Sequence, residues 1–401
     1  MVRTVLALAD GTWFDGYGFG ATARQIQEIT PADPEALREL GEVVFNTAMV
    51  GYPEVLTDPS YTGQIVTMTY PHAGNYGIDA AWSERGPSAR GNEVSVAGFV
   101  VRHLYTGPVP DGRIRLSDYL AEHGVPAISD VDTRALTLHL RDAGSQNGVL
   151  FRPADGTAPS AAELDQVRTL LAEFPTMEGR NLLGVVGAAT TVARPAAESD
   201  AAAAPAAAPR HLALWDTGTK ANIVRILESE GCRVTLLPSD ADAAAIRATG
   251  ADALFISNGP GDPATLEHQV AVTRQLIDAM PVLGICLGHQ IVCEALGAKT
   301  YKMKFGHHGV NHPVRDEFTR QVFVTSQNHG FAVDPETLPR STRVWFQNAN
   351  DRTVEGIWDE QRAVCTTQFH PEAAPGPLDS RYIFARMLSR IGAADSPEPK
   401  A

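Results

Sequence analysis

Short apolar runs alternate with amphipathic stretches in the second half of the chain. Each apolar run spans about five residues, which suits a buried strand, and the stretches between them repeat their apolar positions with the period of a helix. The predicted strands are residues 212–216, 233–237 and 253–257, and the predicted helices are residues 221–230, 242–249 and 267–280. This order predicts a doubly wound, mostly parallel α/β sheet. Functional residues are then expected at the carboxyl edge of its strands.

The first part of the chain has a different pattern. Runs such as residues 63–70 and 95–101 are typical of strands, and they are separated by loop-rich sequence. We therefore expect an N-terminal mixed, β-rich α/β domain over residues 1–150. A connecting segment over residues 151–209 ends in an Ala/Pro-rich linker, residues 187–209, whose composition does not form a core. The doubly wound domain covers residues 210–392, and residues 393–401 are expected to form a flexible tail.

Composition narrows the class of protein. A chain of 401 residues is long enough for two domains, and its net charge of −14 disfavours nucleic acid as a partner. No run of about 18 apolar residues spans a membrane, and the N-terminus is unlike a secretory signal. The four scattered cysteines form neither a disulfide framework nor a metal-binding pair. We expect a cytoplasmic protein that binds no metal.

Cys286 lies where an apolar run breaks at a Gly-x-Cys-x-Gly turn before a helix-like segment. The flanking glycines relieve crowding at a sharp strand-to-helix turn, and the start of a helix directs its free N–H groups toward the sulfur. Such a site favours the ionised thiol and stabilises an oxyanion. The turn alone leaves two interpretations open, a nucleophile or a buried cysteine at the end of a strand.

His370 and Glu372 supply what a thiol nucleophile needs. A thiol passes its proton to a base, and the base needs a group that fixes its orientation. At the end of a strand, residues i and i+2 point to the same side, and Pro371 stiffens the backbone between them. An isolated His-x-Glu is more often a solvated surface pair, but the elbow cysteine favours a catalytic triad of Cys286, His370 and Glu372.

These residues resemble the class I, or triad, glutamine amidotransferases, in which Cys, His and Glu occur in this order. Residues 256–263, 327–333 and 368–377 are also similar to the family's motifs, the last two in the form found in carbamoyl-phosphate synthetase small chains. The resemblance implies hydrolysis of L-glutamine through a cysteinyl thioester. The residues that the resemblance assigns to glutamine binding are Gly259, Gly261, Leu287, Gln290, Asn328, Gly330 and Phe331. His329 is given a secondary or structural role, because His370 has the orienting acid.

The Pro/Gly-rich loop after residue 257 is the candidate for completing an oxyanion hole together with the Cys286 elbow. Attack on an amide carbonyl places negative charge on its oxygen, and backbone N–H groups must already point there. Gly259 has an N–H and no side chain, so we pair it with the N–H of Leu287 as the oxyanion hole. The alternative for this loop, taken without the elbow, is an ordinary turn.

Hydrolysis of L-glutamine releases ammonia, and the N-terminal domain indicates which biosynthetic pathway uses that ammonia. Residues 45–61, and residues 132–137 together with 147–149, are similar to the domain specific to carbamoyl-phosphate synthetase small chains, which other glutamine amidotransferases lack. One position departs from the family: some members have a serine hydroxyl that reaches the substrate, and this chain has Ala48. Ala48 is kept as a candidate glutamine contact: either a backbone group or water replaces the hydroxyl, or glutamine binds more weakly by the modest value of one hydrogen bond.

The full synthesis needs ATP, and no phosphate-binding Gly-x-x-x-x-Gly-Lys-[Ser/Thr] loop is found in the sequence. The resemblance therefore implies a large synthetase subunit that carries ATP and Mg²⁺, receives the ammonia and makes carbamoyl phosphate for pyrimidine or arginine biosynthesis. The expected assembly is a heterodimer or a higher oligomer. Two alternatives stay open: a glutaminase that serves another synthase, such as one for anthranilate or guanylate, and a non-catalytic assembly module.

Overall fold

The computed structural model describes residues 2–31, 38–87, 93–196 and 209–391. These residues form two compact units, which are described separately. The N-terminal unit comprises Met1–Glu84, Asn92–Arg180 and Lys304–Gly309, and the C-terminal unit comprises Arg85–Gly91, Asn181–Met303 and Val310–Ala401. The predicted tail over residues 393–401 and most of the predicted linker lie outside the described residues.

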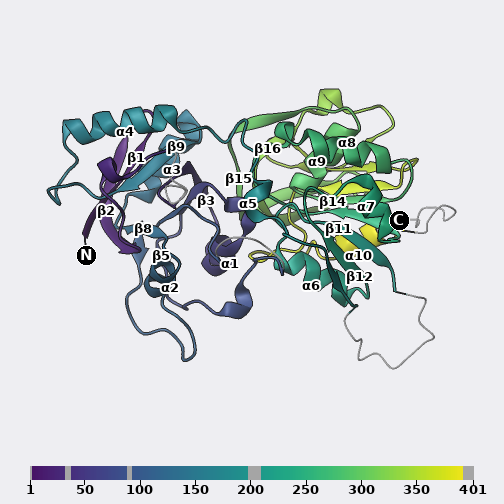
Figure 1. Cartoon of the computed structure of the whole chain (residues 1–401), viewed down its shortest axis with the longest axis horizontal. Coiled ribbons are helices and arrows are strands. Elements are labelled where there is room, and N and C mark those ends of the chain that lie inside the picture. The colour runs from purple at the N-terminus through teal and green to yellow at the C-terminus, as the bar shows by residue number, and fades with distance from the viewer. Residues whose placement is uncertain (1, 32–37, 88–92, 197–208, 392–401) are drawn as a thin grey trace. The chain divides into compact units, whose positions relative to one another are not determined.

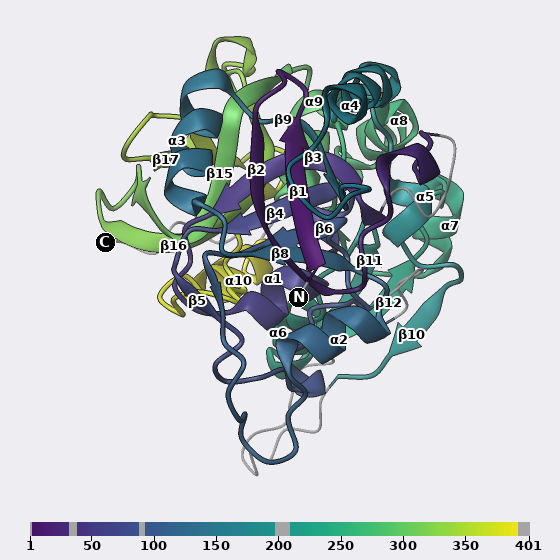
Figure 2. The ribbon, with the colours of Figure 1, turned by 90° about the vertical axis from the view of Figure 1, so that its left-hand side faces the viewer.

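The N-terminal unit is built around a closed barrel with the strand order β1-β2-β8-β6-β4-β3-β9. Figure 2 shows β1 between β2 and β9, its two partners in the barrel. The elements of this part of the chain are β1 (Val2–Leu8), β2 (Trp13–Gly20), β3 (Leu40–Asn46), α1 (Tyr52–Thr57), β4 (Gln64–Met68), β5 (His72–Ala73), β6 (Gly98–Val100), β7 (His103–Leu104), α2 (Leu116–Glu122), β8 (Pro126–Ser129), α3 (Thr133–Ala143), β9 (Gln146–Phe151) and α4 (Ala161–Glu173).

Successive side chains along a barrel strand point to opposite faces of the sheet, and they pack in two separate hydrophobic cores. In β1, Leu6 and Leu8 pack with Leu136 and Leu140 of α3, whereas Val5 and Ala7 face the cluster that contains α4. Helix α4 begins at a capping box formed by Ser160 and Glu163. It lies within the segment over residues 151–209 that the sequence analysis describes as connecting, and in the structure it belongs to the N-terminal unit.

The C-terminal unit contains a sheet of ten strands in the order β10-β12-β11-β13-β14-β19-β18-β17-β15-β16. The neighbours from β12 to β19 are parallel, and the pairs beyond them for which the register is given are antiparallel. The elements are α5 (Leu183–Val186), β10 (Val192–Arg194), β11 (His211–Trp215), α6 (Ala221–Ser229), β12 (Arg233–Leu237), α7 (Ala243–Ala248), β13 (Ala253–Ile256), α8 (Glu267–Leu276), β14 (Val282–Ile285), α9 (Leu287–Ala295), β15 (Thr300–Asp316), β16 (Val322–Val333), β17 (Arg343–Asn348), β18 (Val354–Asp359), β19 (Val364–Thr367) and α10 (Tyr382–Leu388).

Helices cover both faces of the parallel strands, as the doubly wound pattern predicts (Figure 1). Ala213 and Trp215 of β11 pack in the cluster with α7, α8 and α9, and Leu212 and Leu214 pack in the cluster with α6 and α10. A strand buried on both faces reads as a continuous apolar run, which explains why the sequence pattern locates these strands. Short β10 lies inside the predicted linker and pairs with β12 at the edge of the sheet.

Candidate active site

Cys286 stands alone between β14, which ends at Ile285, and α9, which begins at Leu287. Its backbone has φ 55° and ψ −106°, a conformation that L-residues seldom adopt. The backbone N–H of Cys286 donates to the carbonyl of Thr367 on β19 at 2.8 Å, which holds the turn against the sheet. The predicted elbow is therefore present, at the carboxyl edge of the parallel strands (Figure 1).

The two glycines beside Cys286 are required by close packing. A Cβ atom at Gly284 would lie 2.8 Å from the carbonyl carbon of Gly288, and one at Gly288 would lie 2.2 Å from the backbone oxygen of Ile256. Both obstacles are main-chain atoms, which cannot rotate away. Glycine at these positions allows α9 to begin directly against β13 and β14.

His370 and Glu372 are joined as expected, but by a different local structure. The Nδ1 of His370 lies 2.6 Å from Oε1 of Glu372, and both side chains are buried. Strand β19 ends at Thr367, so alternation along a strand does not pair them, and that part of the prediction is wrong. The pair forms in a turn after the strand, closed by the N–H of Ala373 donating to the carbonyl of His370 at 3.1 Å.

The buried pair holds opposite charges. Burial by itself would lower the pKa of His370, but the negative charges of Glu372 and Cys286 outweigh it and raise that pKa well above its ordinary value. Burial would likewise raise the pKa of Glu372, and the charges of His370 and Lys220 lower it instead. The imidazole is thus held as a proton donor, with a carboxylate that stays ionised.

Cys286 lies near His370 and contacts strand β16. The residue is 2% exposed, and its sulfur lies 3.5 Å from the carbonyl oxygen of Asn328 on β16. The buried Nε2 of His370 has no hydrogen-bond partner within the part of the chain that the structure describes. The sulfur is nevertheless near enough for its charge to raise the pKa of His370. Loose contacts of this kind are common in unliganded active sites.

Two further side chains hold the turn that carries Glu372, and the sequence analysis does not identify them. Lys220, at the start of α6, is buried, and its Nζ lies 3.4 Å from Oε1 of Glu372 and donates to the carbonyl of Ala373 at 2.6 Å. Asn222 donates from Nδ2 to the carbonyl of Glu372 at 2.5 Å. Their position after β11, at the same sheet edge as the elbow, is the signal that could have found them.

The loop after β13 lies beside the elbow. A Cβ at Gly259 would lie 2.0 Å from the carbonyl oxygen of Thr217 and 2.9 Å from a methyl carbon of Leu287. Oδ1 of Asn258 accepts the backbone N–H of Lys220 at 3.0 Å, and Gly261 has φ 97°. The structure therefore brings Gly259 and Leu287 together, while their pairing as an oxyanion hole stays a prediction.

The predicted glutamine-binding residues of α9 and β16 also meet. Nε2 of Gln290 donates to the carbonyl of Phe331 at 2.9 Å and to Oε1 of Gln368 at 3.0 Å. Asn328, whose carbonyl touches the Cys286 sulfur, lies on the same strand as Gly330 and Phe331. The structure thus joins α9 to β16 through Gln290 and places Asn328 against the nucleophile, while the contacts of these residues with glutamine stay predictions.

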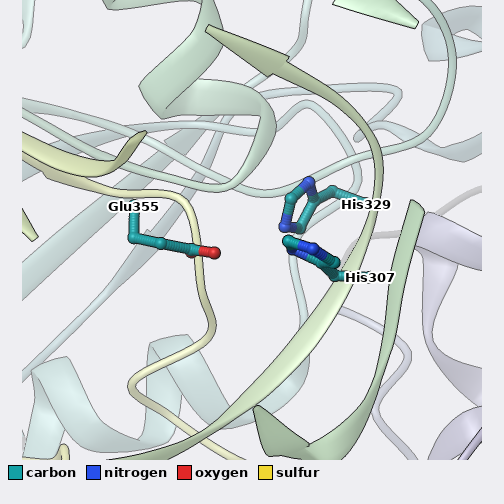
Figure 3. Close-up of side chains that lie close together, drawn as sticks. All are labelled: His307, His329 and Glu355. Atoms are coloured by element: carbon teal, nitrogen blue, oxygen red, sulfur yellow. The ribbon is translucent and has the colours of Figure 1, made fainter. Parts of the chain in front are cut away.

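His329 belongs to a buried hydrogen-bond network with Gln327 and Glu355. Its ring nitrogens lie 2.8 Å from the carbonyl of Phe331 and 2.9 Å from Oε1 of Gln327. Nε2 of Gln327 donates to Oε2 of Glu355 at 2.9 Å. His329 and Glu355 are labelled in Figure 3. The network fits the structural role expected for His329, because both of its nitrogens are occupied.

Ala48 lies in the N-terminal unit, two residues after β3. Its side chain is fully buried, and its N–H donates to Oδ1 of Asn46 at 2.7 Å. Asn46 in turn donates from Nδ2 to the hydroxyl of buried Tyr61 at 2.8 Å. The N–H of Ala48 is therefore already engaged and is a poor substitute for the missing serine hydroxyl. Its contact with glutamine stays a prediction.

Comparison with known proteins matches each part of the chain to a family. Residues 213–389 match the family described as glutamine amidotransferase class-I, and residues 6–150 match the carbamoyl-phosphate synthase small chain, CPSase domain. A carbamoyl phosphate synthase small chain from Nitratidesulfovibrio vulgaris (strain Miyazaki F) is 43% identical over 97% of this chain and 98% of its own. The chain belongs to the carbamoyl phosphate synthase small chain family.

Other members are equally similar along their whole length. The small chain of Akkermansia muciniphila is 42% identical over 98% of both chains, and that of Neisseria meningitidis serogroup B is 41% identical over 97% of this chain and 98% of its own. Membership of this family agrees with the triad geometry and with the N-terminal domain. Among the described residues, no helix is both long and apolar enough to cross a membrane.

Proposed function

We propose that this chain is the glutaminase subunit of a glutamine-hydrolysing carbamoyl phosphate synthase. The observation that carries the proposal is the buried triad, in which an elbow cysteine faces a histidine whose Nδ1 is held 2.6 Å from the Glu372 carboxylate. A binding-only module needs neither the strained turn nor the buried charges. The CPSase domain over residues 6–150 supports carbamoyl phosphate synthesis over the other amidotransferase reactions.

The reaction begins with attack of the Cys286 thiolate on the side-chain amide carbon of L-glutamine. The carbonyl electrons move to oxygen, where the N–H groups of Gly259 and Leu287 are proposed to hold the charge. His370, kept protonated by Glu372, donates a proton to the amide nitrogen, and ammonia leaves as the carbonyl re-forms. This yields a γ-glutamyl thioester on the Cys286 sulfur.

Hydrolysis of the thioester returns the enzyme to its starting state. His370, now neutral, accepts a proton from water as the water oxygen attacks the thioester carbon. The carbon–sulfur bond breaks, glutamate departs, and the thiolate forms again beside protonated His370. Throughout both steps, Lys220 and Asn222 hold the turn that orients Glu372.

The partner in this proposal is a large synthetase subunit, joined as a heterodimer or in a higher oligomer. It would bind ATP and Mg²⁺, activate bicarbonate and combine it with the ammonia made here. The names of the relatives, which are small chains, support such a partner. The four free, buried cysteines support the expected cytoplasmic location, since thiols stay reduced there.

The test is the variant Cys286→Ser in the complex with a large subunit. We expect glutamine-dependent carbamoyl phosphate synthesis to fall by about a thousandfold or more, because the weaker nucleophile lacks an ionised form. Synthesis from added ammonium should stay at the wild-type rate. Cys293→Ala on the same helix is the matched control and should retain both activities. Loss of both in Cys286→Ser would assign the residue a structural role.

A further inference from the structure

The loop between β11 and α6, residues 216–220, ends at the lysine that contacts the triad. Nζ of Lys220 lies 3.4 Å from Oε1 of Glu372, and the backbone N–H of Lys220 donates to Oδ1 of Asn258 at 3.0 Å. The beginning of the loop is fixed separately, because the hydroxyl of Thr217 donates to the carbonyl of Asn258 at 3.0 Å. The turn between these two points therefore determines where Lys220 leaves the loop.

A buried carboxylate, that of Asp216, holds this turn. Asp216 is 1% exposed, and its Oδ1 accepts the N–H of Gly218 at 3.0 Å and both the N–H and the hydroxyl of Thr219 at 2.8 Å. Its Oδ2 accepts the N–H of Ala188 at 3.0 Å, which anchors the loop to the segment before β10. Hydrogen bonds to an ionised acceptor are stronger than neutral ones. Removal of the carboxylate would leave these buried donors without this acceptor and loosen the turn.

We infer that Asp216 is a positioning residue for glutamine hydrolysis, which acts on the triad by fixing the turn that carries Lys220; this inference rests on the proposed glutaminase function. The carboxylate is bound to the backbone of its own loop, so its effect reaches Glu372 through the ammonium of Lys220. Burial would raise the pKa of Glu372, and the charges of His370 and Lys220 lower it. A displaced Lys220 would leave Glu372 less well oriented, and proton transfer by His370 would slow.

The first test measures the glutamine kinetics of Asp216→Ala in the complex with a large subunit. We expect kcat to fall by about a hundredfold with a smaller change in KM, because a misplaced catalytic group affects chiefly the transition state. Asp216→Asn should lose less, since its side-chain oxygen can still accept from Gly218 and Thr219. Asp240→Asn, an exposed acid in the same unit, is the matched control and should leave kcat unchanged. Ammonium-dependent synthesis should be equal in all of them.

The second test is a double-mutant cycle, which separates positioning of Lys220 from a general structural role. Adding Asp216→Ala to Lys220→Met should lower kcat by about twofold at most, because the lysine that Asp216 positions is already gone. The same cycle with Asp216→Asn, which keeps the size of the side chain, gives the answer if Asp216→Ala fails to fold.

Two results overturn the inference while the glutaminase function stands. One is an unchanged kcat in both Asp216 variants, and the other is a double variant whose loss equals the product of the two single losses. Failure of the wild-type complex to hydrolyse L-glutamine would instead overturn the proposed function, and this inference with it.

Discussion

At the scale of single residues, the charged groups of the site come from separate parts of the sheet edge: Glu372 and Cys286 raise the pKa of His370, and His370 and Lys220 lower the pKa of Glu372. Glu372 lies in the turn after β19, Cys286 at the elbow after β14, and Lys220 at the start of α6. Burial opposes every one of these charges taken alone. Together they compensate one another, so the site keeps a buried imidazolium at His370 beside the ionised carboxylate of Glu372.

The pH dependence of glutamine hydrolysis follows from the raised pKa of His370. The imidazole is protonated below its ordinary pKa of 6.5 and stays so until the pH passes the raised value, so the rate should fall on the alkaline side only there. Glu372→Gln removes the main charge that raises this pKa. We expect the alkaline limb of kcat/KM to move to lower pH, and kcat to fall by about a hundredfold or more.

This prediction is checked by the pH profile of the glutaminase rate in the complex. Asp379→Asn, an exposed acid in the same loop region, is the control and should leave the profile unchanged. An alkaline limb that stays in place in Glu372→Gln would mean that Glu372 does not set the charge of His370.

The sequence identifies the three residues of the triad, but not the two residues that hold Glu372 in place. Cys286 lies in a recognisable elbow, and His370 with Glu372 in a short motif, so their types and spacing were enough. Lys220 and Asn222 have no motif, because they reach Glu372 only through the folded sheet. The spacing of His370 and Glu372 also predicted that both lie on a strand. In the structure the two residues lie in a turn, which is closed by a hydrogen bond from the N–H of Ala373 to the carbonyl of His370.

At the scale of elements, the elbow depends on close approach of α9 to β13. The variant Gly288→Ala would push a methyl group into the backbone oxygen of Ile256, 2.2 Å away, and the strand or the helix must move. We expect a loss of about 1–3 kcal/mol in the free energy of unfolding. Urea unfolding followed by circular dichroism measures it, and glutamine hydrolysis should fall as well, because Cys286 adjoins the displaced turn.

Gly184 offers a matched control for this substitution. It lies in α5, and a Cβ there meets no atom within 4 Å. Gly184→Ala should be neutral or stabilising, by up to about 1 kcal/mol, since alanine favours a helix. Equal effects of the two alanines would contradict the steric account of the elbow.

The elements that the sequence predicts best are those buried on both faces. Strands β11 to β13 and helices α6 to α8 lie close to the predicted ranges, because their apolar runs and helical periods are strong. Strands β15 and β16 have a patchy burial pattern with exposed and half-buried residues, so the hydrophobic pattern does not reveal them. Short β10 depends on pairing with β12, a contact that Ala/Pro-rich composition does not predict.

At the scale of the whole molecule, this chain is expected to make ammonia and to leave its use to a partner. Co-expression with the large subunit of a relative should yield a complex that contains this 42.9 kDa chain. Removing the chain should abolish glutamine-dependent synthesis and spare ammonium-dependent synthesis, and adding it back should restore the former. Mass measurement of the intact complex with both assays checks this. Failure to assemble, or a product other than carbamoyl phosphate, would contradict the proposed partner.

The four cysteine thiols of the chain differ in one respect that makes the protein easy to quantify. Burial raises the pKa of Cys232 to about 11 and of Cys365 to about 12, and that of Cys293 well above its ordinary value. These thiols are poor nucleophiles at neutral pH. An electrophile shaped like glutamine should therefore label Cys286 alone, and the moles of label per mole of chain then count the working active sites in a preparation.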